Sequence, residues 1–228
     1  MIHSLGRRLS LIFDRGADGS DSTGASHPGA AVLYPLVDFV AYADDCTLSG
    51  RIRLRADRLT DMLNDHEELH LVDVLVQSVV DRAAVEVREV VVPRDELVLV
   101  HATGPRGDQT RRTRTRTTHV AITADRYQVR GQLHAAQFVD ALTALHRRGP
   151  MVPLTDAIID YPIGDEWQRQ RVGTLIVNRS AIDHIVETPE HDITVIDQAP
   201  AESDVTFADV AAAFAASGRL PDPAGSTS

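Results

Sequence analysis

Residues 40–54, VAYADDCTLSGRIRL, share one pattern with residues 121–135, AITADRYQVRGQLHA, and this shared pattern is the main evidence for the fold. A constant offset of 81 in the numbering brings together four pairs of similar residues: Ala43 with Ala124, Asp44 with Asp125, Leu48 with Val129, and Gly50 with Gly131. Later blocks match at offsets of 79, 83 and 85, as small insertions and deletions would produce. Collinear agreement across four blocks predicts an internal duplication.

Each repeat shows the same order of elements. Alternating stretches at 39–43 and 47–54 flank Asp44-Asp45, a turn-forming pair that indicates a hairpin. An apolar helical stripe follows in each repeat, formed by Leu59, Met62 and Leu63 and then by Phe138, Leu142 and Leu145. Three segments rich in β-branched residues complete the repeats, at 71–79, 85–92 and 97–101 and again at 154–161, 171–177 and 182–186.

Five short strands and one helix in roughly 70 residues favour a small barrel, because closing a sheet removes its edges. We therefore expect a mainly β chain with short helices (α+β), built as two tandem small β-barrel repeats, each β-β-α-β-β-β. The predicted organisation is an amphipathic peptide at 1–13, a flexible linker at 14–36, repeat one at 37–103, a basic linker at 104–117, repeat two at 118–188, and an acidic tail at 189–228 with a helix at about 206–217.

Composition restricts the classes of function. The net charge of −10 excludes a surface that binds phosphate backbones everywhere, so any such contact must be local. The single cysteine, Cys46, cannot form an internal disulfide, and the longest apolar runs fall short of the roughly 20 residues of a bilayer span. These features predict a cytoplasmic protein.

The strand blocks of the second repeat resemble the Sm-like (SH3-like) small-barrel superfamily. Three segments carry the likeness, namely Gly131-Gln132-Leu133, Leu154-Thr155-Asp156-Ala157, and Val172-Gly173-Thr174-Leu175-Ile176-Val177 followed by Ile182 and Ile185. The first repeat keeps Gly50, Leu71-Val72-Asp73-Val74 and Val90-Val91-Val92. The resemblance implies a small-barrel fold. In Sm-like RNA binders an Arg-Gly pair lines the nucleotide pocket, and here Asn178-Arg179 and Pro93-Arg94 replace it.

One short motif suggests metal chemistry. His66-Glu67-Glu68-Leu69-His70 fits H-E-x-x-H, so on a helix His66 and His70 would share a face and bind zinc while Glu67 activates a water. The segment lies where a helix gives way to a strand, however, and no third ligand can be nominated. We expect a polar helix end and no cofactor, with a zinc hydrolase as the minor alternative.

The segment between the repeats is basic, since Arg111, Arg112, Arg114 and Arg116 are interspersed with threonines. In an extended chain alternate arginines point to one side about 7 Å apart, a spacing comparable to successive phosphates. No aromatic residues are interleaved, so base stacking is not indicated. The alternatives are an anion or RNA contact and a solvated linker or strand whose charges deter aggregation.

The amino terminus is the strongest candidate for docking. On a helical wheel the apolar residues share one face and the two arginines lie away from it: Ile2, Leu5, Leu9, Ile12 and Phe13, with Arg7 and Arg8. Such a helix could dock on a partner protein, lie on a membrane surface, or pack on its own barrel. Trp167, in the polar stretch 164–170, is either an interface anchor or folds back on the barrel.

The sequence contains no Gly-rich phosphate loop, no G-x-S-x-G and no Cys pair. We therefore expect a non-enzymatic adaptor or scaffold that binds an unidentified protein partner through its tandem barrels and terminal helices. One form of this hypothesis places the protein at the membrane surface. Edge strands could also pair between chains, which predicts a homo-oligomer. The alternative from another class is an RNA-binding Sm-like protein.

Overall fold

The fold is mainly β, with ten strands and two short α-helices in the part described. The structure, a computed structural model, describes residues 34–107, 115–164 and 166–189. The first half contains β1 (Leu36–Ala43), β2 (Cys46–Arg53), α1 (Leu59–Asp65), β3 (Glu68–Ser78), β4 (Ala84–Pro93), a 3₁₀ turn (Arg94–Glu96) and β5 (Leu97–His101). The second half contains β6 (Thr115–Ala124), β7 (Tyr127–Ala136), α2 (Ala141–Arg147), β8 (Met151–Ile163), β9 (Glu166–Asn178), a 3₁₀ turn (Arg179–Ala181) and β10 (Ile182–Glu187).

The element order is the same in both halves, as the sequence predicts, with one error at the second helix. Asp140 accepts a hydrogen bond from the Thr143 amide and caps α2, so the helix begins after Phe138. Phe138 itself has a φ of 70° and is 94% exposed, and it is no part of a helical stripe. The first residue of α1, Leu59, therefore corresponds to Ala141 and not to Phe138.

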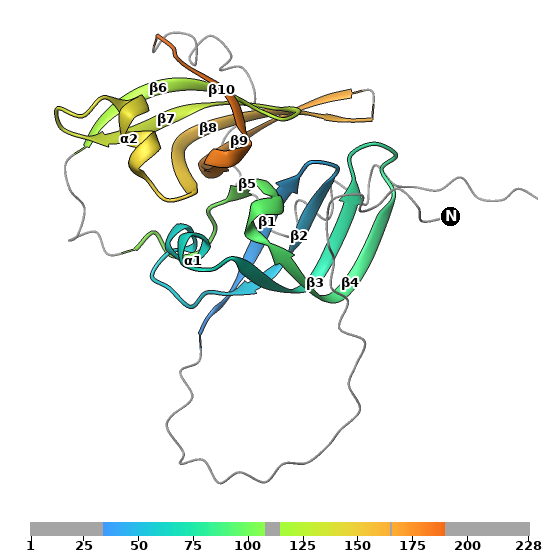
Figure 1. The fold of residues 1–228 in the computed structure, drawn as a ribbon. Coiled ribbons are helices and arrows are strands. Elements are labelled where there is room, and N and C mark those ends of the chain that lie inside the picture. The colour runs from blue at the N-terminus through green and yellow to red at the C-terminus, as the bar shows by residue number, and fades with distance from the viewer. Residues whose placement is uncertain (1–33, 108–114, 165, 190–228) are drawn as a thin grey trace, which may run out of the picture.

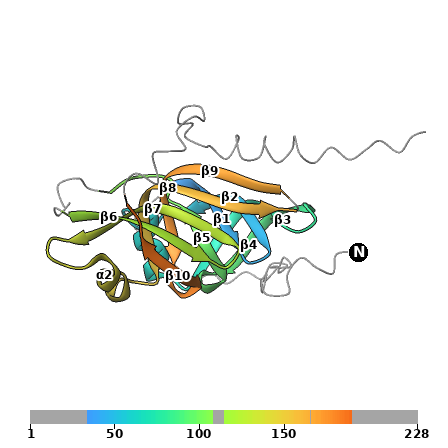
Figure 2. The same ribbon diagram turned by 90° about the horizontal axis from the view of Figure 1, so that it is seen from above.

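All ten strands form one antiparallel sheet in the order β10-β6-β7-β8-β9-β5-β1-β2-β3-β4. The prediction that each repeat closes into its own barrel is not confirmed, because the ten strands form one open sheet. β9 pairs with β5 of the other half instead of with β10. The second half lies above the first in Figure 1, and the strongly twisted sheet is seen from above in Figure 2.

Strand pairing in the two halves matches residue by residue, at the three larger offsets found in the sequence. Ser49 pairs with Leu75 just before a register shift, and Arg130 pairs with Ile158 before the same shift. Asp73 and Asp156, which the sequence alignment matches, both have positive φ, at 50° and 47°. Because bulges depend on local backbone geometry, their recurrence shows that residues matched by these sequence offsets also occupy equivalent positions in the two halves of the structure.

The two halves share their hydrophobic cores. The first core is built from the first half but includes Met151 and Ile176 of the second half. The second core in turn includes four side chains of the first half: Val40, Tyr42, Val98 and Leu99. β5 is buried along its whole length, so separating the halves would expose apolar surface from both cores.

Candidate functional site at the junction of the halves

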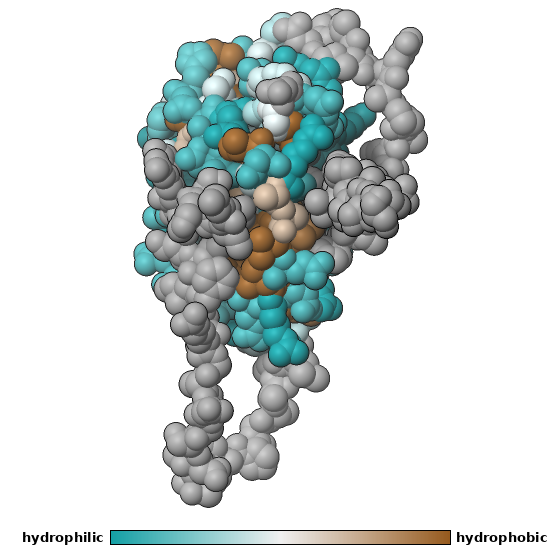
Figure 3. All heavy atoms as spheres, turned by 90° about the vertical axis from the view of Figure 1, so that its right-hand side faces the viewer, coloured by the Kyte–Doolittle hydropathy of each residue, from teal (hydrophilic) through white to brown (hydrophobic). Residues whose placement is uncertain are grey.

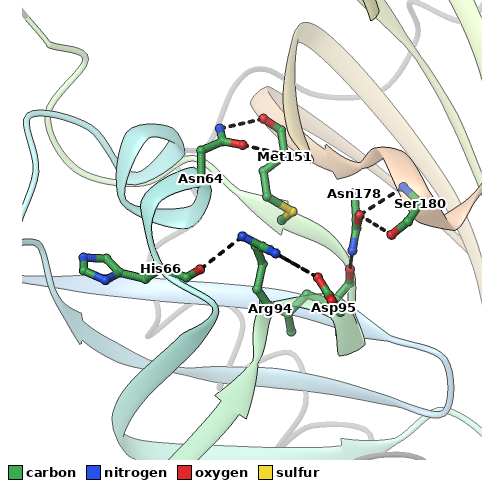
Figure 4. A network of polar contacts seen from close by, with 8 residues as sticks. Asn64, His66, Arg94, Asp95, Met151, Asn178 and Ser180 are labelled. Carbon is green, nitrogen blue, oxygen red and sulfur yellow. Dashed lines mark hydrogen bonds and ion pairs between the residues drawn. The ribbon is translucent and has the colours of Figure 1, made fainter. Parts of the chain in front are cut away.

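At the junction of the two halves, side-chain amides form hydrogen bonds with backbone groups and take the place of missing backbone partners. Asn64, at the end of α1, donates to the carbonyl of Met151 and accepts from the amide of the same residue, each at 3.0 Å (Figure 4). Asn178, fully buried, donates to the Leu97 carbonyl at 2.8 Å and accepts from the amide and hydroxyl of Ser180. These contacts satisfy polar groups that burial would otherwise leave unpaired.

A buried aromatic cluster lies on the same junction. The Tyr42 hydroxyl donates to Gln170 Oε1 at 2.9 Å and lies 3.1 Å from His101 Nε2. With the hydroxyl proton directed to Gln170, His101 carries its own proton on Nε2 and donates it to Tyr42. The rings of Tyr127 and Tyr161 meet Tyr42 edge-on, with centroids 5.5 and 5.1 Å away.

Burial keeps this cluster neutral. Desolvation lowers the pKa of His101 to about 4, and desolvation together with neighbouring tyrosines raises the pKa of Tyr42 well above its usual range. Neutral side chains joined by hydrogen bonds help to orient the two halves, because Tyr42 and His101 belong to the first half and Gln170 to the second. The cluster therefore acts as a polar lock between the halves.

The tips of two long hairpins, one from each half, also contact each other. The Gly164 amide donates to the Val79 carbonyl at 2.8 Å, and Gly164 adopts a φ of 61° there. Arg82 donates to the Ile163 carbonyl at 3.2 Å and pairs with Glu166 at 2.9 Å. Figure 1 shows both hairpins, β3–β4 and β8–β9, pointing to the same side of the molecule.

Three exposed apolar side chains lie on these two hairpins. Val80 is 65% exposed in the β3–β4 turn, Trp167 is 61% exposed on β9, and Val85 is 38% exposed on β4. We call these three residues the tip surface. Figure 3 views this end of the molecule and shows apolar patches in brown among hydrophilic surroundings. The polar stretch around Trp167, which lies between two of the strands predicted from the sequence, is itself strand: Trp167 pairs with Pro162 across the hairpin.

The H-E-x-x-H segment lacks the helix that its zinc chemistry requires. Helix α1 ends at Asp65, His66 follows as its C-cap in extended conformation, and His70 lies in β3. His66 and His70 therefore do not share the helical face that the zinc alternative requires, and Glu67 lies between helix and strand. No group of three metal-ligating side chains occurs among the residues the structure describes.

The arginines divide into three groups. Arg111, Arg112 and Arg114 lie outside the described residues, whereas Arg116 is an exposed residue of β6. The second half thus begins at Thr115, ahead of the predicted boundary at 118. Arg94 and Arg179, which follow the strands resembling the Sm-like signature, both bond backbone carbonyls: Arg94 that of His66, and Arg179 those of Leu145, His146 and Arg148.

The terminal docking candidates lie outside the described residues. They are the peptide with Ile2, Leu5, Arg7, Arg8, Leu9, Ile12 and Phe13 and the predicted helix at 206–217. Sequence reasoning singled out Trp167 but missed Val80 and Val85. The signal was available at Val79-Val80-Asp81, where an apolar pair stands in a turn between two strand segments.

Comparisons with known proteins found no matching family model, no matching curated protein and no matching solved structure. In the described parts of the chain, no helix is long and apolar enough to cross a membrane.

Proposed function

We propose that this chain is a non-enzymatic adaptor or scaffold that binds a protein partner through the tip surface. The observation that carries the proposal is the exposed apolar trio of Val80, Val85 and Trp167 on two hairpins that contact each other. Large exposed apolar side chains that cluster mark interaction sites, whereas scattered ones need no explanation.

We also infer that the two halves are duplicated modules of small-barrel type. Matching registers, bulges and element order support this inference. Joining two modules through β5 and β9 brings one hairpin of each to the same end of the molecule. A duplication thus yields a composite surface that neither module carries alone.

The tip surface has the properties of a protein contact. Tryptophan is enriched among residues that dominate binding energy, and its rigid ring loses little entropy on binding. At the tips the Gly164 amide is already bonded to the Val79 carbonyl, and the Arg82–Glu166 pair already balances its charges. A partner can therefore cover the apolar side chains without leaving those polar groups unpaired.

The test is affinity capture with the tagged full-length chain, followed by crosslinking and mass spectrometry of the contact. Trp167→Ala combined with Val80→Ser should weaken the retained partner at least about tenfold, the effect of removing a central anchor. Phe138→Ser is the matched control, because Phe138 is 94% exposed yet lies on the loop before α2.

Three outcomes would overturn the proposal. The first is a partner retained equally by the tip variant and the Phe138→Ser control. The second is nucleic acid as the stoichiometric ligand, lost on nuclease treatment, which would favour the RNA-binding alternative. The third is recovery on lipid vesicles alone that disappears with Leu5→Asp and Leu9→Asp, which would make the amino-terminal peptide a membrane anchor.

A further inference from the structure

The ten-stranded sheet ends in two strands that each have one unpaired side. β4 pairs only with β3, and β10 pairs only with β6, among the residues that the structure describes. β4 is ten residues long and β10 six. Open edges of this length present backbone donors and acceptors that can pair with another strand.

The chain already contains the contact that these edges could make. β5 and β10 are equivalent strands of the two halves, because Leu99 pairs with Tyr42 as His184 pairs with Thr123. β4 and β9 are equivalent in the same way, because Val92 pairs with Leu69 as Val177 pairs with Val152. The internal β5–β9 junction therefore joins the same two kinds of edge that remain open.

We propose that β10 of one copy of this chain pairs with β4 of a second copy, in the register of the β5–β9 junction. The inference goes beyond the proposed function, since it concerns the sheet edges and not the tip surface. The expected partner is a second copy of the chain, because that copy carries the complementary edge and the sheet would continue through an interface of known geometry.

The internal register fixes the residues that would meet. Val100 pairs with Ile176 and His101 with Leu175 inside the chain, and the Ala102 amide donates to the Thr174 carbonyl. When each residue is replaced by its equivalent in the other half, these contacts become Ile185 with Val91, Val186 with Val90, and Glu187 with Glu89. Val186 is 41% exposed and becomes covered.

The contact between copies is weaker than the one inside the chain. Val98 and Leu99, buried at the internal junction, correspond to Asp183 and His184, which are exposed on β10. Glu187 facing Glu89 adds repulsion, since like charges directly opposite destabilise a strand pair. We therefore expect association that depends on protein concentration.

The two edges that would pair, β10 and β4, lie at opposite ends of the sheet, so the contact between copies is heterologous. Each added copy uses one of its two edges and leaves the other open, so the assembly always keeps one open edge of each kind, and growth ends only when a ring closes. The mass of the assembly should consequently exceed that of a dimer at high concentration.

Sedimentation of the full-length chain over a wide concentration range tests the proposal through the facing glutamates. Glu89→Arg alone, or Glu187→Arg alone, places opposite charges across the contact and should lower the dissociation constant by roughly five- to tenfold. The double variant restores like charges and should return association to the wild-type level. Asp65→Arg, an exposed residue on α1, makes the same change of charge away from both edges and should have no effect.

Three results would overturn the inference. The first is sedimentation of wild type and both single variants as single chains at every concentration. The second is association that responds to Asp65→Arg as strongly as to Glu89→Arg, which would reveal a general charge effect. The third is a double variant that keeps the gain of the single variants, which would show that the two glutamates do not face each other. Partner capture through the tip surface is independent of each of these results.

Discussion

Mild acid should destabilise the fold through His101. This imidazole is 5% exposed, and burial lowers its pKa to about 4, from a value near 6.5 in the unfolded chain. Between these values the unfolded state binds the proton and the folded state does not, so stability is complete above the unfolded pKa and falls as the pH drops toward 4. From about pH 7 to about pH 5 the loss from this one group is about 2 kcal/mol.

The assay is urea unfolding at both pH values for wild type and for His101→Gln. Glutamine keeps a donor for Tyr42 but does not titrate, so this variant should lose about 2 kcal/mol less than wild type over the same range. His70→Gln, at an exposed position on β3, should keep the wild-type loss. Equal losses in wild type and His101→Gln would refute the assignment of a neutral, buried imidazole.

Three further predictions concern the junction and the buried core. Asn178→Ala removes a buried amide that bonds the Leu97 carbonyl at 2.8 Å, and it should cost about 2–4 kcal/mol in the free energy of unfolding; a cost near zero would mean that water replaces the amide. Gly50→Ala should lower the free energy of unfolding by about 1–3 kcal/mol, and by more than Gly131→Ala does. The new methyl group would lie 2.9 Å from its nearest neighbour at Gly50 but 3.3 Å from it at Gly131. A larger loss of thermal stability in Gly131→Ala than in Gly50→Ala would contradict the stated packing. Cys46 should resist thiol reagents at mildly alkaline pH until the chain unfolds, because burial raises its pKa to about 12, and rapid labelling of the native protein would show otherwise.

Sequence periodicity predicted the elements and their duplication because local patterns determine both. Gly50 and Gly131 recur because each lies opposite a bulge, in β3 and in β8 respectively, and the close approach of the bulged strand leaves a trace in the sequence. The predicted strands were too short where both faces of a strand are exposed. The hairpin around Trp167 extends to the Ile163–Glu166 pair although its residues show no apolar alternation.

The junction could not be predicted from the sequence. Alternation shows which face of a strand is buried but not which strand lies beside it, so β5 was expected to close its own barrel. Its five buried residues are explained only by neighbours on both sides, β1 and β9. The lock between Tyr42, His101 and Gln170 was missed for the same reason, since His101 and Gln170 lie far along the chain from Tyr42.

The tip surface depends on one feature, the pairing of β5 with β9 that unites the halves. Hydrogen exchange measured by mass spectrometry on dilute full-length protein tests it most directly. Amides of β5 should exchange as slowly as those of the interior strand β2, whereas amides of the outer strands β4 and β10 should exchange faster. Rapid exchange across β5 and β9 with slow exchange in β2 would show that the halves are separate, and would contradict a composite surface at the hairpin tips.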